Sequence, residues 1–95
     1  MYTSTAQYRH MLFGQRLAIG LVNYVDAYVN EEVELATTVG ALERQLNMIR
    51  RTFDGDPDVA ALAAPGQIYE VVEDTLHLKM DNFKRLCQAL RTLHF

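Results

Sequence analysis

A single apolar stripe runs through the first half of the chain and limits what it can fold into. Its members follow one another at alternating spacings of four and three residues: Leu21, Val25, Tyr28, Glu32, Leu35, Val39, Leu42, Leu46, Ile49 and Phe53. This alternation is typical of an α-helix that packs lengthwise against other helices. The sequence therefore predicts helix as its main element, and only Glu32 departs from the apolar pattern.

The continuity of the first helix is open at Asn30. No proline occurs between residues 6 and 53, which allows one long helix, straight or kinked, over that range. The stripe keeps its phase past Asn30, and neither glycine nor proline lies beside it, which favours continuity. An asparagine followed by glutamates is also typical of a helix N-terminus, which favours a break there. The sequence alone supports both interpretations.

Two further helices are predicted after Phe53. The sequence Asp56-Pro57-Asp58 is typical of a helix start and predicts a short helix over residues 57–64. A last helix is predicted over residues 67–93 from a second stripe, which comprises Val72, Leu76, Lys79, Phe83, Leu86, Leu90 and Leu93. We expect it to pack antiparallel on the second half of the first stripe, because the 54–66 connection is short.

These elements predict a single all-α domain over residues 1–95. If the first helix is unbroken, the fold is a helical hairpin whose long helix outreaches its partner and exposes apolar surface. A second copy would then cover that surface in a dimer or larger assembly. If the helix breaks at Asn30, its first part can fold back into a three-helix bundle, and assembly becomes optional.

Glu32 has three interpretations. A single polar residue in a helical seam often fixes register or oligomeric state, and Lys79 is the matching polar position of the last helix. Glu32 is alternatively part of a recognition site. If the stripe ends at Asn30, Glu32 is simply exposed.

The predicted last helix carries the main candidate metal ligands, Glu70, Asp74 and His77, and the only plausible extra ligands are Glu31, Glu32 and Glu34. The Asp74-x-x-His77 spacing resembles the carboxylate-x-x-histidine ligand pairs of di-iron helical bundles. These residues share a side of the helix with Lys84, so a solvated polar face explains them more simply. We therefore predict no metal and no cofactor.

Charge and cysteine content narrow the classes of partner. The net charge of −3 disfavours nucleic-acid binding, for which Arg44, Arg50 and Arg51 are the candidate basic residues. The apolar segment 17–29 is too short to span a bilayer, so we expect no membrane insertion. One cysteine, Cys87, forms no intrachain disulfide, and we expect a reducing, cytoplasmic compartment.

We therefore expect a non-enzymatic helical protein–protein interaction module. It would act as a self-assembling subunit, an adaptor or an inhibitor within a larger complex, with itself or another protein as partner. The alternatives are a small dimeric nucleic-acid-associated regulator and a carboxylate–histidine metal-binding bundle. The candidate interface residues are Met11, Leu12, Leu21, Val25, Tyr28 and Glu32.

Overall fold

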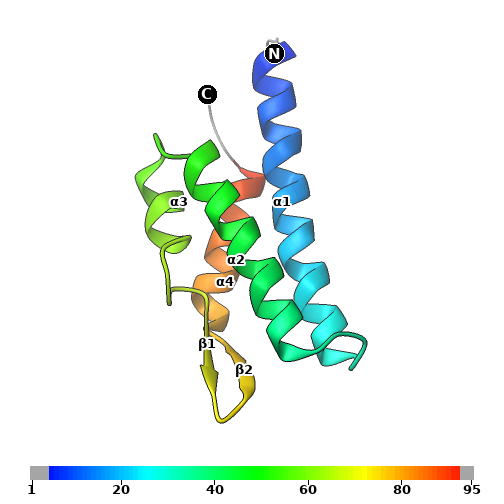
Figure 1. Cartoon of the computed structure of the whole chain (residues 1–95). Helices are drawn as coiled ribbons and strands as arrows, with labels where there is room; N and C mark the ends of the chain where they lie inside the picture. The colour runs from blue at the N-terminus through cyan, green and yellow to red at the C-terminus, as the bar shows by residue number, and fades with distance from the viewer. Residues whose placement is uncertain (1–4, 93–95) are drawn as a thin grey trace.

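The computed structural model describes the backbone of residues 5–92 and the side chains of residues 12–92. This part of the chain is mostly helical, as predicted, with one small antiparallel sheet (Figure 1). Its elements are α1 (Thr5–Val29), α2 (Leu35–Thr52), α3 (Pro57–Leu62), β1 (Tyr69–Val72), β2 (Thr75–Leu78) and α4 (Met80–Arg91).

α1 ends at Val29, so the interpretation as one unbroken first helix is wrong. Glu31 has a left-handed backbone, with φ of 60°. Its N–H donates to the Tyr28 carbonyl at 3.0 Å, and the Glu32 N–H donates to the Ala27 carbonyl at 2.9 Å. Together these bonds form a Schellman motif, which satisfies carbonyls at the helix end. Glycine usually occupies the left-handed position, so a glutamate there gives no warning in the sequence.

α2 folds back beside α1, and both halves of the apolar stripe then face inward. Leu21 of α1 and Leu42 of α2 are fully buried, and Val25 is 7% exposed. α1 approaches both α2 and α4 closely, whereas α2 lies against α1 and α3 (Figure 1). The buried residues of the second half of the stripe share one core with those of the last helix, although the backbones of α2 and α4 do not approach as closely as those of α1 and α4. The buried core comprises Leu17, Ala18, Leu21, Val25, Leu42, Leu46, Ile49, Phe53, Val59, Ala63, Ile68, Tyr69, Phe83, Leu86, Cys87 and Leu90.

α3 begins where the Asp-Pro-Asp sequence predicts. The Asp56 carboxylate accepts the N–H groups of Asp58 and Val59 at 3.1 and 3.2 Å, and Pro57 occupies the first helical position. These bonds satisfy donors that a helix start otherwise leaves free. Val59 then points into the core and is fully buried.

The predicted helix over residues 67–93 is wrong in its first half, which forms a β-hairpin. β1 and β2 pair antiparallel, with Tyr69 opposite Leu78 and Val72 opposite Thr75. The connecting Glu73 and Asp74 have φ of 51° and 59°, the left-handed pair that a two-residue type I′ turn requires. The physical reason is local: alternating side chains let one face of the hairpin cover the core, where Tyr69 is buried and Leu76 and Leu78 are half-buried.

Hydrogen bonds from three elements hold the hairpin against the helices. The Leu76 N–H lies on the outer edge of β2 and donates to the Tyr28 hydroxyl of α1 at 3.2 Å. The buried Tyr69 hydroxyl donates to the Glu43 carboxylate of α2. At the base of the hairpin, the Asn82 amide of α4 donates to the Gln67 carbonyl at 2.9 Å. α1 and α2 are therefore bonded to the hairpin itself, and α4 is bonded to the segment that leads into it.

The hairpin also reverses the expected direction of the last helix. α3 and the segment after it carry the chain back past α2, and the hairpin then starts α4 near the beginning of α2 (Figure 1). α2 and α4 consequently run in the same direction, and α1 runs opposite to both (Figure 1). The predicted antiparallel packing across the 54–66 connection is therefore wrong.

Gly20 provides a close approach between α1 and α2. The Gln45 side-chain amide of α2 donates to the Leu17 carbonyl of α1 at 3.1 Å. A Cβ atom on Gly20 would lie 2.6 Å from the Gln45 Nε2 atom, which is closer than such atoms pack. The glycine therefore leaves the space in which this interhelical hydrogen bond forms.

The left-handed residue predicts a stabilising substitution. Glu31→Gly should raise the free energy of unfolding by about 1 kcal/mol, because glycine adopts positive φ without the steric cost of a side chain. Urea denaturation followed by circular dichroism measures this change. Glu32→Gly is the matched control: its backbone does not have positive φ, so it should give no gain. Equal effects of the two substitutions would contradict the assignment.

The Gly20 contact predicts a substitution whose effect depends on its partner. Gly20→Ala should leave the free energy of unfolding nearly unchanged, because the new methyl group displaces the end of the flexible Gln45 side chain, and the loss of its hydrogen bond to Leu17 offsets the helix propensity of alanine. In a Gln45→Ala background, the same Gly20→Ala change should stabilise by about 1 kcal/mol. Thermal unfolding of the four proteins forms the double-mutant cycle. Additive effects would show that Gln45 does not occupy the space beside Gly20.

Candidate partner-binding surface

A surface groove lies between α1 and α4. Its volume is about 410 Å³. The apolar part comes from Val22 of α1 and from Phe83 and Cys87 of α4, while Lys84 and Arg91 bring positive charge. The lining residues are Val22, Phe83, Lys84, Cys87, Gln88, Arg91 and Thr92.

A second helical stripe on α1 borders the groove, and its members are exposed or half-buried, with Val22 packed against the edge of the core. We call it the outer stripe; it comprises Leu12, Gln15, Ile19, Val22, Asp26 and Val29. Its spacings are again three and four residues, which place its members on one helical face. Ile19 is 51% exposed and Val29 is 68% exposed, the largest exposed fraction among the large apolar residues described. α1 therefore carries two apolar faces, of which the protein covers one.

The exposed side of α4 is cationic although the whole chain is acidic. Lys84, Arg85 and Arg91 are all exposed, and none has an ion-pair partner among the residues that the structure describes. Unpaired cations beside an apolar groove suit a partner that brings carboxylates and an apolar side chain together.

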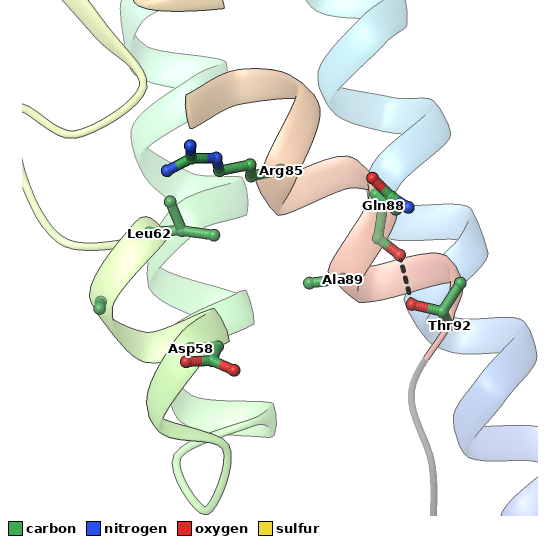
Figure 2. Close-up of a pocket in the computed structure, with 7 residues that line it drawn as sticks. Asp58, Leu62, Arg85, Gln88, Ala89 and Thr92 are labelled. Atoms are coloured by element: carbon green, nitrogen blue, oxygen red, sulfur yellow. Dashed lines mark hydrogen bonds between the residues drawn. The ribbon is translucent and has the colours of Figure 1, made fainter. Parts of the chain in front are cut away.

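A second groove, of about 470 Å³, lies between α3 and α4 (Figure 2). Leu62 and Ala89 form its apolar part, with Arg85 and Asp58 at its borders (Figure 2). Gln88 and Thr92 line both grooves, and the Thr92 hydroxyl donates a hydrogen bond to the Gln88 carbonyl at 2.8 Å. Both sides of α4 therefore offer shallow apolar contacts.

An acidic hollow of about 660 Å³ lies at the α1–α2 loop. Its lining residues are Tyr28, Val29, Glu31, Glu32, Val33, Glu34, Leu35 and Asp74. The hollow brings together two of the predicted interface residues, Tyr28 and Glu32. Tyr28 is half-buried and its hydroxyl accepts the Leu76 N–H, whereas Glu32 is exposed.

The predicted interface residues divide between the core and the surface. Leu21 and Val25 lie in the core of this chain, so they are not free to contact a partner. Leu12 is half-buried on the outer stripe, and the side chain of Met11 lies outside the described residues. The hypothesis that Glu32 fixes register with Lys79 is wrong, because Glu32 is in an exposed loop and the Lys79 ammonium donates to the Gly66 carbonyl.

The candidate metal ligands do not form the expected helical site. Glu70 and His77 lie opposite each other on the two strands, and Asp74 lies in the turn. Among the described residues, no group of histidine, cysteine and carboxylate side chains is arranged to hold a metal ion. The carboxylate-x-x-histidine spacing places two ligands on one face only in a helix, and residues 74–77 are not helical.

The predicted basic cluster on α2 is partly occupied by internal bonds. Arg50 donates to the Ala63 carbonyl at the end of α3 and to the Asn47 side chain. Arg44 and Arg51 remain exposed. Arg50 therefore joins α2 to α3 and is not free to contact a phosphate backbone.

Cys87 lies in the groove with a thiol that is hard to ionise. It is 6% exposed, and burial raises the pKa of the Cys87 thiol, while the positive charge of Arg91 partly offsets that rise. The neutral thiol accordingly behaves as a small apolar side chain at neutral pH.

Comparisons with known proteins assign no relative to this chain: no family model, curated protein or solved structure matches it. Among the described residues, none of the helices is long and apolar enough to cross a membrane.

Sequence reasoning missed the outer stripe as a separate surface. The segment 17–29 is apolar on both faces of the helix, so the outer stripe is hard to distinguish in the sequence from the apolar stripe that forms the core. The sequence did contain a signal for it, because the outer stripe also has alternating spacings of three and four residues. It passes through Asp26 where the first stripe passes through Val25, and two of its positions are polar. The groove itself had no sequence signal, because it depends on the direction of α4.

The electrostatics of the groove predict the titration of its thiol. Arg91→Ala should raise the pKa of Cys87 further, because it removes the positive charge that favours the thiolate. The measurement is the pH at which the rate of thiol modification reaches half its maximum, which is insensitive to access alone. Arg85→Ala is the matched control on the same helix and should leave that pH unchanged. A shift to lower pH in Arg91→Ala would contradict the prediction.

Proposed function

We propose that this protein is a non-enzymatic protein-interaction module that binds its partner through the outer stripe of α1 and the adjoining α1–α4 groove. The observation that carries the proposal is the exposed Ile19, one helical turn from Val22 of the groove. Continuous apolar surface beside unpaired cations is characteristic of a protein contact surface.

The architecture supports an interaction role over a catalytic one. The most exposed large apolar side chains lie on a rigid 25-residue helix, where a contact surface keeps its shape before binding. The groove beside it is shallow and contains a thiol whose pKa is raised, so its nucleophilic form is scarce at neutral pH. Adaptor, inhibitor and self-assembling subunit are the roles that such a helical surface supports.

The two alternatives have less support in the described residues. The nucleic-acid hypothesis needs Arg50 on the surface, and that side chain is bonded within the fold. The metal hypothesis needs inward-pointing ligands on facing helices, whereas Glu70 and His77 are exposed on a hairpin. An apolar contact surface requires neither condition.

Photocrosslinking in the source cells tests the proposal. The photoreactive residue p-benzoylphenylalanine replaces Ile19 in one variant and Met48 in a control. Met48 is also an exposed apolar residue, 38% exposed, but lies on α2 away from the groove. We expect a discrete crosslinked product from the Ile19 variant, lost when Val22→Asp is added, and none from the Met48 variant. Equal labelling from both positions, or none from Ile19, would overturn the proposal.

A further inference from the structure

The outer stripe of α1 has the same order of apolar and polar positions in both directions along the helix. From Leu12 to Val29 its positions are apolar, polar, apolar, apolar, polar and apolar. A two-fold symmetric interface needs a surface that is complementary to itself. For two antiparallel helices, that condition means that a stripe must match its own reversal, as this one does.

We propose that α1 pairs antiparallel with α1 of a second copy of this chain, along the outer stripe. The two-fold axis passes at the level of Gly20 and Leu21. Leu12 then faces the partner's Val29, and Ile19 faces the partner's Val22. This inference rests on the proposed interaction role and names the partner for the same surface.

The polar positions of the stripe also match in this arrangement. Gln15 faces the partner's Asp26, so an amide N–H meets a carboxylate oxygen. Arg16 follows Gln15, which brings its guanidinium beside the partner's Asp26. Arg16 and Asp26 are both exposed, and neither has an ion-pair partner within the part of the chain that the structure describes. Each dimer therefore gains two complementary charge pairs.

The same positions disfavour a parallel dimer. A symmetric parallel pair brings each residue opposite its own copy, so Asp26 would face the partner's Asp26 at the seam. Two carboxylates held together repel, and the apolar neighbours on either side would hinder their hydration. The charges therefore select the antiparallel orientation, even though an exposed ion pair adds little affinity by itself.

The α1–α4 groove receives a side chain in the antiparallel dimer. The partner's Ile19 lies opposite Val22, which lines the groove together with Phe83 and Cys87. An isoleucine that is 51% exposed in the single chain thereby gains apolar contacts with α4 as well as α1. The stripe from Leu12 to Val29 extends over about 27 Å of helix, so five turns contribute.

Sedimentation velocity over a range of protein concentrations tests the dimer. We expect the natural chain to form a dimer below about 0.5 mM, and Ile19→Ala to raise the dimer dissociation constant at least about tenfold, because two buried side chains are truncated per dimer. Met48→Ala is the matched control and should leave the constant unchanged. A natural chain that is monomeric at this concentration, or equal constants for Ile19→Ala and the control, would overturn the dimer.

Charge reversal tests the Arg16–Asp26 pairing. Asp26→Arg and Arg16→Asp should each weaken the dimer, since each brings like charges together. The double variant with both changes, and an equimolar mixture of the two single variants, should restore it. Loss of dimer in the double variant, with circular dichroism unchanged, would overturn the pairing.

Disulfide crosslinking tests the orientation. In a Cys87→Ser background, Leu12→Cys chains mixed with Val29→Cys chains should crosslink under mild oxidation, whereas Leu12→Cys chains alone should not. Crosslinking of Leu12→Cys alone would indicate a parallel pair and overturn the orientation. A monomeric chain would leave the proposed interaction role standing, because the Ile19 photocrosslink also detects a different protein; absence of that photocrosslink would overturn both.

Discussion

The left-handed backbone at Glu31 is the constraint on which the rest of the structure depends. Without it, α1 and α2 would form one helix of roughly 70 Å. The two halves of the apolar stripe would then lie on the same side of that helix and could not pack against each other. The Schellman motif turns the second half back onto the first. A core then forms inside one chain, and the surface of α1 left outside that core becomes the outer stripe.

The sequence was sufficient to predict the structure where the structure follows helical periodicity and capping chemistry. Leu42, Leu46 and Ile49 belong to the stripe that was predicted to pack against other helices, and they are buried. Asp56 was predicted as a helix cap from the proline that follows it, and its carboxylate accepts two backbone N–H groups. In both cases, a short-range rule determines the outcome.

Prediction failed where unusual residues adopt left-handed backbone. Glu31, Glu73 and Asp74 all have positive φ, and none is a glycine. The reversal near Asn30 was therefore left open, and the reversal at Glu73 and Asp74 was missed, although the alternation of Tyr69, Val71 and the residues of β2 is a strand pattern. The direction of α4 follows from these reversals, so the groove and the grouping of Lys84 with Arg91 could not be predicted.

The arrangement of the helices also determines how the chain can be joined to something else. α1 begins and α4 ends toward the same end of the molecule, whereas the α1–α2 loop and the hairpin turn lie at the other (Figure 1). A tether that enters at α1 or leaves at α4 therefore joins the described part of the chain at one end. Such a tether leaves the carboxylate-rich loop end pointing away from the attachment and open to solvent.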